Sequence, residues 1–238
     1  MRVGPYGPFR FNSHFAFSDF ENWGGGHNAG FEACVEMCRG KRCVFDVGAH
    51  IGLVSLPMSS VLGDGGKVYA FEPADANRNF LLDHIAKNQA KNIEVNGCLV
   101  GDNDRNRVQF FELASASGVN SVVVPSNDNA YIVTHKSQIT LDTFCAERSL
   151  KPEVIKIDVE GSELSVLRGA HQTLEACGPT IFLSVHPRHL GLLGETTEAL
   201  GALIEGLGYE CRNIDGSPAG DLVFGEYLLI HKTRAHKE

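Results

Sequence analysis

Hydrophobic positions from residue 43 onward fall into short, nearly continuous runs that alternate with amphipathic stretches. The runs occupy residues 43–47, 68–71, 93–100, 154–157 and 180–185. Runs of this kind predict strands buried on both faces, because crossover helices cover both sides of a parallel sheet. The alternation therefore predicts an α/β fold with a mostly parallel sheet built from βαβ units.

Helical spacing appears between the runs. Residues 51–62 predict a helix that Pro57 should kink, because proline lacks the amide hydrogen of an interior turn. Residues 75–88 predict an amphipathic helix that Asp75 can cap. A further helix should end at Gly208. The tail then predicts two strands, over 209–214 and 222–231, that form an antiparallel pair at the end of the sheet.

Two regions depart from this alternation. Residues 1–40 are rich in aromatic side chains, contain a run of three glycines at 24–26 and predict a helix over 29–39. Such a segment is either a lid over a pocket or a permanent cover packed on the core. Residues 103–138 contain three β-like runs, over 108–113, 119–124 and 130–135, and predict an inserted set of strands. Residues 41–238, with this insertion, should form one domain.

Composition narrows the choice of partners and compartment. The 238 residues include 21 Lys and Arg against 29 Asp and Glu, for a formal net charge of -8. This balance disfavours a nucleic-acid partner, because phosphates require a cationic surface. No apolar run approaches the ~18–20 residues of a membrane span. The seven scattered cysteines lack zinc-finger spacing, so we expect reduced thiols and a cytoplasmic location.

A glycine turn follows the first predicted strand and precedes a helix, the arrangement that opens a nucleotide pocket at the carboxyl end of a sheet. Gly48 and Gly52 do not complete the G-x-G-x-x-G pattern of dinucleotide-binding proteins. Asp46, at the end of the strand, would repel a pyrophosphate but attract an ammonium or sulfonium group. The turn therefore favours S-adenosylmethionine over a nicotinamide dinucleotide.

Two further acids follow the next predicted strands. Glu72 lies 24 residues after Gly48, near the roughly 20-residue offset at which an acid meets a ribose diol. A carboxylate accepts hydrogen bonds from both hydroxyls. Asp102 follows the third run, where it could accept from an adenine amino group. Each acid alone is also typical of a turn or a surface, but acids at three successive strand ends predict a cofactor site.

The chain resembles the FkbM family of S-adenosylmethionine-dependent methyltransferases over about residues 43–187. The resemblance rests on FDVGA at 45–49, FEP at 71–73, TLD at 140–142, IKIDVEG at 155–161 and VLRGA at 166–170. It implies a seven-stranded Rossmann-like sheet with a reversed last hairpin, and O-methylation of a sugar, glycolipid or natural product. The cofactor-binding residues that we expect are Asp46, Gly48, Ala49, His50, Gly52, Glu72, Pro73, Asp102 and Asp158. Two positions depart from the family, where Asn is more usual than His50 and Glu is common in place of Ser184.

The catalytic candidates are Asp158, Glu160 and His186, which follow the last two runs and should meet at one edge of the sheet. An alcohol must lose its proton during methylation, and His186 is the candidate base whose ordinary pKa lies near neutrality. Asp158 is the second candidate base, and Glu160 could instead complement the following helix. His189 could reach the site if the chain turns helical after Pro187.

Several alternatives remain open at the level of the sequence. A divalent ion on Asp158, Glu160 and His186 would also acidify the hydroxyl, although the spacing does not demand one and the predicted site contains no metal. An NAD(P)-dependent oxidoreductase and an inactive small-molecule-binding module are the competing functions. The acceptor should be a small molecule or glycan, and a homo-oligomer is compatible with the sequence.

Overall fold

The computed structural model describes residues 1–23, 28–113, 115–118, 120–122 and 131–235, and it contains the expected seven-stranded sheet. The strand order is β3-β2-β1-β7-β8-β10-β9. β10 runs antiparallel to both of its neighbours, and the other pairs are parallel, so the predicted fold and reversed hairpin are confirmed. The strands are β1 (Cys43–Val47), β2 (Lys67–Phe71), β3 (Ile93–Asn96), β7 (Val154–Ile157), β8 (Thr180–Val185), β9 (Tyr209–Asn213) and β10 (Gly225–His231).

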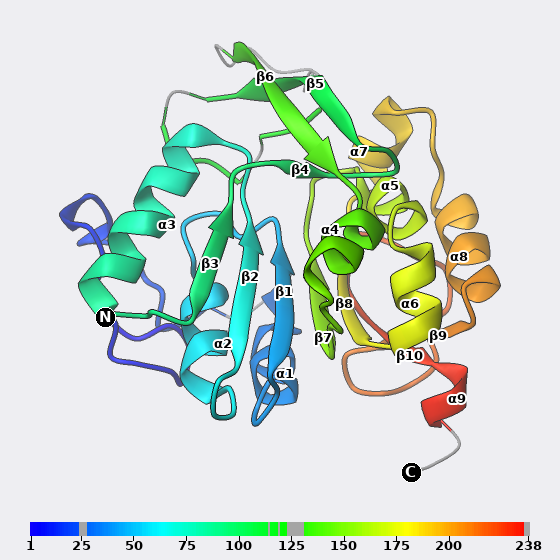
Figure 1. Ribbon diagram of the computed structural model, residues 1–238, viewed down its shortest axis with the longest axis horizontal. Helices are drawn as coiled ribbons and strands as arrows, with labels where there is room; N and C mark the ends of the chain where they lie inside the picture. The colour runs from blue at the N-terminus through cyan, green and yellow to red at the C-terminus, as the bar shows by residue number, and fades with distance from the viewer. Residues whose placement is uncertain (24–27, 114, 119, 123–130, 236–238) are drawn as a thin grey trace.

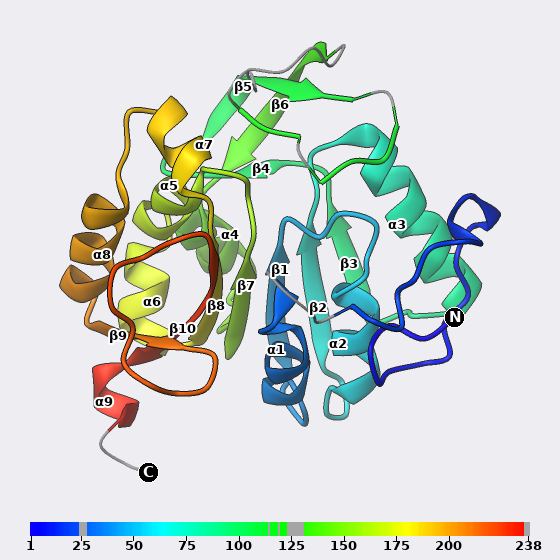
Figure 2. The same cartoon turned by 180° about the vertical axis from the view of Figure 1, so that it is seen from behind.

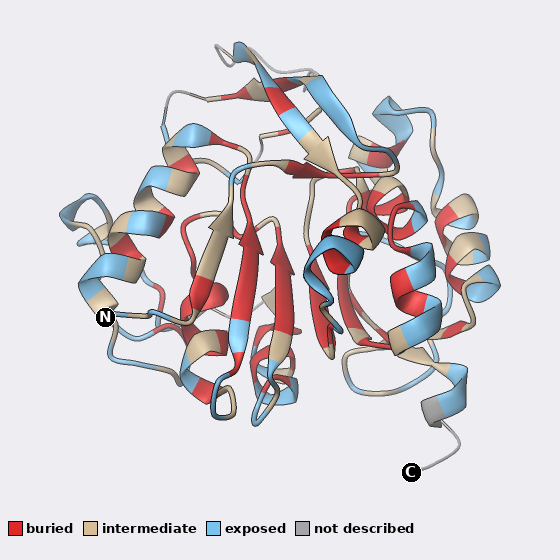
Figure 3. Cartoon of the chain, in the orientation of Figure 1, coloured by how far each residue is buried: buried red, intermediate tan, exposed pale blue. Residues whose placement is uncertain are grey.

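Helices cover both faces of this sheet, as Figures 1 and 2 show. Alternating side chains of β1 enter the two layers, because Phe45 belongs to one buried cluster and Val44 to the other. Burial on both faces, visible in Figure 3, explains the continuous apolar runs. One layer contains α1 (Phe31–Met37), α2 (Ser55–Val61) and α3 (Asp75–Asn88), and the other contains α4 (Leu141–Arg148), α5 (Glu163–Arg168), α6 (His171–Cys177) and α8 (Thr197–Gly206).

A small second sheet lies across the carboxyl ends of the main strands (Figure 1). It contains β4 (Leu99–Val100), β5 (Arg105–Glu112) and β6 (Ile132–Ile139) in the order β4-β6-β5. The single strand predicted over 93–100 is therefore wrong, because the chain leaves the main sheet after Asn96 and its second part pairs with β6. Of the predicted run 119–124, residues 119, 123 and 124 lie outside the described residues, as does residue 130.

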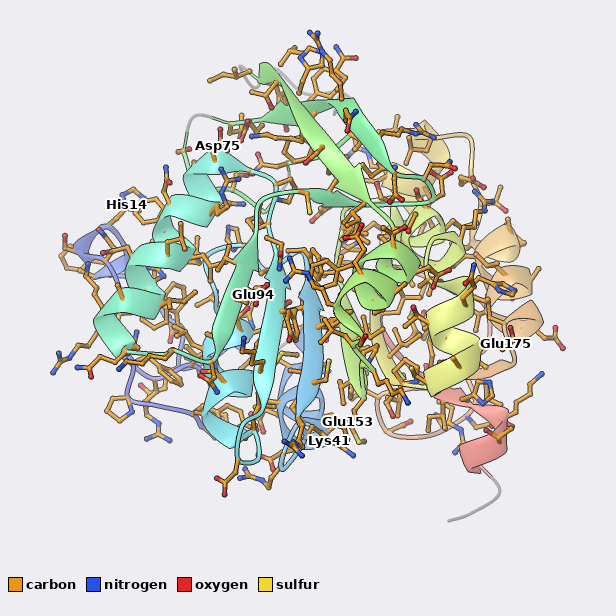
Figure 4. The ribbon with its side chains drawn as sticks, in the orientation of Figure 1. His14, Lys41, Asp75, Glu94, Glu153 and Glu175 are labelled. Atoms are coloured by element: carbon orange, nitrogen blue, oxygen red, sulfur yellow. The ribbon has the colours of Figure 1, made fainter. Side chains whose placement is uncertain are left out.

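A buried lysine of the small sheet pairs with an exposed carboxylate at the start of α3 and links the two elements. The Nζ of Lys136, on β6, lies 2.9 Å from Asp75 Oδ1 and 2.9 Å from Glu112 Oε1. Figure 4 shows Asp75 at the end of α3 that faces the small sheet. Asp75 therefore pairs with a cation rather than capping its own helix, which has no side-chain cap. The predicted bounds of α3 are confirmed.

Pro57 occupies the first turn of α2, because this helix begins at Ser55 rather than at residue 51. Amides in a first turn have no partner within the helix. The proline therefore removes no helical hydrogen bond, and the reason for the predicted kink is absent. Three further helical segments occur in the described residues, namely a 3-10 turn at Ser13–Phe15, α7 at Pro187–Leu192 and α9 at Lys232–Ala235.

The aromatic N-terminal segment packs against the α1–α3 layer, beside α3 in Figure 2. Val3 and Phe20 are buried, and the rings of Phe11 and Phe15 lie 4.8 and 5.6 Å from the ring of His84. Residues 24–27, including the glycine run and His27, lie outside the described residues. That the segment moves as a lid stays a prediction. No helix in the described part of the chain is long and apolar enough to cross a membrane.

Candidate active site

A cavity of about 1140 Å³ lies at the carboxyl ends of β1, β2, β7 and β8, beneath the small sheet. Pockets that hold one drug-sized ligand have volumes of about 300–1,000 Å³, so this cavity has room for a cofactor together with a second molecule. Most of the residues selected from the sequence line it, namely Gly48, Ala49, His50, Glu72, Pro73, Asp102, Asp158, Glu160 and His186. Asp46 and Gly52 are absent from the lining.

The glycine turn after β1 forms one wall of the cavity. Gly48 has a φ of +85°, and a Cβ built on it would lie 1.8 Å from the carbonyl oxygen of Asp158, so only glycine lets the turn approach the end of β7. The amides of Gly48 and Ala49 both donate to the Phe71 carbonyl, at 3.0 Å. His50 follows with a φ of +51°, a conformation that histidine and asparagine adopt more often than most residues.

Glu72 is fixed by backbone amides at the end of β2. His50 N donates to Oε2 at 2.8 Å and Ala74 N donates to Oε1 at 2.9 Å. Burial raises the pKa of Glu72 to about 7, although these hydrogen bonds and Asn77 favour the ionised form. Oε1 also accepts a hydrogen bond of 3.4 Å from Asn77 Nδ2, so Oε2 is the oxygen that keeps a second lone pair for a ribose hydroxyl.

Asp46 lies behind the cavity wall, because it is the penultimate residue of β1 and points toward the α2 layer. It is fully buried, accepts a hydrogen bond of 2.5 Å from Ser55 Oγ, and lies 3.6 Å from Lys156 Nζ. Asp46 does not line the cavity, whereas its partner Lys156 does, and the expected direct contact between Asp46 and a cationic cofactor stays a prediction. Gly52 packs against α3, where a Cβ would lie 2.7 Å from Leu81.

Lys156 is a buried cation in the middle of β7 and lines the cavity. Burial alone would lower the pKa of Lys156, but the carboxylates of Asp158, Asp46 and Glu226 outweigh burial and raise it. Lys156 was not among the site residues predicted from the sequence. A charged residue inside an otherwise apolar run of four residues was the available signal.

Asp158, Glu160 and His186 meet after β7 and β8, and the glycine turn after β1 lies between them and Glu72 at the end of β2. β7 and β8 are adjacent and parallel, so the residues after them emerge side by side. Nε2 of His186 lies 3.6 Å from Asp158 Oδ1 and 3.7 Å from Glu160 Oε1. One ligand atom from each of the three residues lies within 4.8 Å of the others.

Glu163, the first residue of α5, sits behind this cluster. It is fully buried, and its Oε1 lies 2.7 Å from Nδ1 of His186. Burial lowers the pKa of His186, but Glu163, Glu160 and Asp158 outweigh this effect and raise it to about 9. His186 is therefore cationic at neutral pH when nothing but these residues surrounds it. Glu163 was not selected from the sequence, although it is a third acid close to Asp158 and Glu160.

His189 reaches the site as the helical turn after Pro187 would allow. It lies on α7 and lines the cavity, and its Nδ1 lies 2.8 Å from Glu160 Oε2. Burial raises the pKa of Glu160 to about 7. The neighbouring carboxylates of Asp158 and Glu163 also raise it, whereas His186 lowers it. Burial lowers the pKa of His50, on the facing wall, to about 4, so His50 is neutral there.

β8 has Ser184 where the family commonly has a glutamate, and Glu226 on β10 places a carboxylate beside this position. Glu226 pairs with Ser184 across the antiparallel strands, and Ser184 Oγ lies 3.4 Å from Glu226 Oε1. Glu226 also accepts a hydrogen bond of 2.5 Å from Gly30 N, which ties the start of α1 to the site. Asp102 is at the rim, 3.4 Å from Arg105. Glu226 was missed because no local pattern reveals which residue of β10 faces position 184.

Comparison with known proteins agrees with this architecture. A family model described as the methyltransferase FkbM domain matches residues 46–211. The AMB antimetabolite synthetase AmbE of Pseudomonas aeruginosa is 28% identical over 201 residues, which cover 70% of this chain and 9% of AmbE.

Solved structures share the fold. A methyltransferase FkbM from Methylobacillus flagellatus has a TM-score of 0.51 at 21% identity, over 81% of this chain and 44% of the other. A Clostridium thermocellum protein assigned as an rRNA methylase has a TM-score of 0.50 at 7% identity, over 84% of this chain and 91% of the other. The chain thus spans less than half the length of AmbE and of the FkbM structure.

Proposed function

The chain belongs to the FkbM methyltransferase family, and from this premise we propose that it transfers a methyl group from S-adenosylmethionine to a hydroxyl group of a sugar, glycolipid or natural product. Its domain is that of an S-adenosylmethionine-dependent methyltransferase. The observation that carries the proposal is one continuous cavity with Glu72 at one end and the Asp158, Glu160 and His186 cluster at the other.

The glycine-turn end of the cavity fits the methyl donor. Gly48 leaves the space that a Cβ would fill, and Glu72 presents a buried carboxylate to a ribose diol. The neutral Nε2 of His50 is buried without a hydrogen-bond partner in the described structure, so it can bind a polar group of the ligand. When bound, S-adenosylmethionine supplies a methyl carbon already activated by its sulfonium. The residues of this wall then orient the donor and exclude water.

The cluster at the other end would bind the acceptor hydroxyl and remove its proton. Glu163, Glu160 and Asp158 raise the pKa of His186 to about 9, which favours its cationic form near neutrality over its expected role as the base. Glu160, with a pKa of about 7, is matched to general-base work near neutrality. Asp158 stays in ion pairs with Lys156 and His186 and would orient the hydroxyl.

The mouth of the cavity suits an acceptor with an apolar face. Phe224, Leu192 and Leu193 line it and are at least 40% exposed, so they can pack against a sugar ring or an apolar tail. The similarity to a segment of an antimetabolite synthetase supports a natural-product acceptor. The net charge of -8 disfavours nucleic acid. The seven cysteines form no disulfide with one another, which supports a reducing compartment such as the cytoplasm.

Radiolabelled methyl transfer tests the proposal. The protein is incubated with S-[methyl-³H]adenosylmethionine and a panel of sugars, glycolipids and hydroxylated natural products, and the products are separated and treated with base to distinguish ethers from esters. We expect a base-stable labelled ether with at least one acceptor class. Label on carboxyl groups or on RNA would contradict the proposed O-methylation of a hydroxyl.

A further inference from the structure

Three potential ligand atoms face one another at the acceptor end of the cavity. The distances of 3.6 and 3.7 Å from His186 Nε2 to the oxygens of Asp158 and Glu160 are too long for hydrogen bonds. Two ligands that each lie ~2.1 Å from one ion are about 3.0 Å apart at an octahedral angle and about 3.4 Å apart at a tetrahedral angle, so small side-chain shifts bring these atoms to either geometry. The observed separations therefore suit atoms that share an ion better than atoms that bond to each other.

The second polar atom of each of these three side chains lies close to a residue that is not part of the cluster. His186 Nδ1 lies 2.7 Å from the fully buried Glu163. Lys156 Nζ donates to Asp158 Oδ2 at 3.3 Å, and His189 Nδ1 lies 2.8 Å from Glu160 Oε2.

Glu163 has the position of the carboxylate that supports a metal-bound histidine. A carboxylate that accepts from Nδ1 places the hydrogen on that nitrogen and leaves the lone pair on Nε2, which faces the cluster. Glu163 does not line the cavity, so the substrate would not contact it. An acid buried behind the wall is explained by orientation of the imidazole.

Charge points to the same kind of ligand. Asp158, Glu160 and Glu163 bring three carboxylates together, with Lys156 as the neighbouring ammonium group. With His186 neutral, these carboxylates outnumber the ammonium group, which Asp46 also shares at 3.6 Å, and a divalent cation would offset the excess negative charge.

We propose that Asp158, Glu160 and His186 bind one divalent cation, and that Glu163 positions His186 for it. One imidazole with two carboxylates suits an ion between the hardest and the softest divalent metals, such as Mn²⁺. The role of the ion rests on the proposed function, whereas its binding does not. Bound to the ion, the acceptor hydroxyl would become more acidic. With Glu160 bound to the ion, water takes its place as the base: the O–H bond would break with the proton passing to water, an O–C bond would form as the S–C bond breaks, and S-adenosylhomocysteine would leave.

Binding of Mn²⁺ to metal-free protein tests this proposal without methyl transfer. The protein is treated with EDTA and desalted, and free Mn²⁺ is measured by its electron paramagnetic resonance signal during titration. We expect one ion per chain in the wild type. His186→Ala and Glu160→Gln should lose this site, and Glu163→Gln should weaken it by about 10- to 100-fold although it removes no ligand.

Matched controls separate this site from surface binding. His171→Ala and Glu175→Gln alter exposed residues of α6 that do not line the cavity; Figure 4 shows Glu175 beside this helix. Both variants should leave the affinity unchanged. Thermal unfolding in EDTA checks that each variant is folded. If Glu163→Gln does not fold, the partly exposed Glu160→Gln carries the test.

Two outcomes would overturn the proposal. One is the absence of a stoichiometric Mn²⁺ site in the wild type, and the other is equal affinity in the wild type and the folded cluster variants. Titration of S-adenosylhomocysteine into the EDTA-treated wild type keeps the two proposals distinct. Cofactor binding without Mn²⁺ binding would refute only the metal site, and Mn²⁺ binding without cofactor binding would refute only the proposed function.

Discussion

The two ends of the cavity are built in different ways. At the glycine turn, Glu72 is held by backbone amides of residues close to it in sequence or on the neighbouring strand. At the other end, His186 is held by Glu163 and faces two further carboxylates, so side chains position one another. The first end therefore has few protonation states, whereas the second depends on protons or ions that its charged groups share.

This difference indicates which end of the cavity binds the cofactor and which end takes part in proton transfer. A rigid wall with one acceptor carboxylate suits recognition of a constant cofactor, and a coupled cluster suits the movement of a proton. Variants at one end should therefore change cofactor binding, and variants at the other should change turnover. The predictions below test this division.

The largest effect is expected at the cluster. His186→Ala should slow methyl transfer by about 100-fold or more, because the cluster loses the group that Glu163 positions and that pairs with both carboxylates. The affinity for S-adenosylhomocysteine should stay within about twofold of the wild type. Steady-state kinetics and titration calorimetry measure the two quantities, with His171→Ala as the control. A large loss of cofactor affinity would break the division between the two ends.

Asp46→Ala should destabilise the protein rather than merely empty the cofactor site. Removing a fully buried carboxylate strips Lys156 of one of its partners and leaves Ser55 without an acceptor. We expect the free energy of unfolding to fall by about 3 kcal/mol, measured by urea denaturation. Asp64→Ala, at an exposed position, should change it by less than about 0.5 kcal/mol. An unchanged free energy of unfolding would show that Asp46 contributes to ligand binding and not to stability.

His186 and Asp46 also show how much of the site can be predicted from the sequence. The glycine turn, Glu72 and the cluster of Asp158, Glu160 and His186 were predicted because strand ends and short motifs reveal them. The burial of Asp46 was not predicted, because the strand continues to Val47 and alternation turns Asp46 toward α2.

Residues from more distant contacts could not be predicted. Glu226 reaches the site through the register between β10 and β8, and Lys136 anchors the small sheet through Asp75 and Glu112. The strand predicted over 93–100 divides because its second part finds a partner in β6. Such pairings are set by tertiary contacts and leave no local periodic pattern.

Glu72→Gln should weaken binding of S-adenosylhomocysteine by about 10- to 100-fold, the effect of losing charge-assisted hydrogen bonds. Glu112→Gln is a matched control, because Glu112 is equally buried but pairs with Lys136 outside the cavity. Calorimetry should show an unchanged affinity for this control. Full affinity in Glu72→Gln would remove Glu72 from the cofactor site.

The pH dependence of cofactor binding should report Glu72, and its effect is the smallest of the four. Burial raises the pKa of Glu72 to about 7, so below this pH one oxygen carries a proton and accepts fewer hydrogen bonds. Because the diol favours the ionised form, affinity should rise by up to about tenfold from pH 6 to pH 8. Glu72→Gln should show no such rise, and a rise of equal size in that variant would assign the effect to another group.

The central claim is that the glycine turn and Glu72 bind S-adenosylmethionine rather than a phosphate-bearing dinucleotide. Calorimetric titration of the purified protein with S-adenosylhomocysteine and, separately, with NADH tests it most directly. We expect one S-adenosylhomocysteine to bind per chain and NADH to give no binding heat. Stoichiometric binding of NADH together with no response to S-adenosylhomocysteine would contradict it.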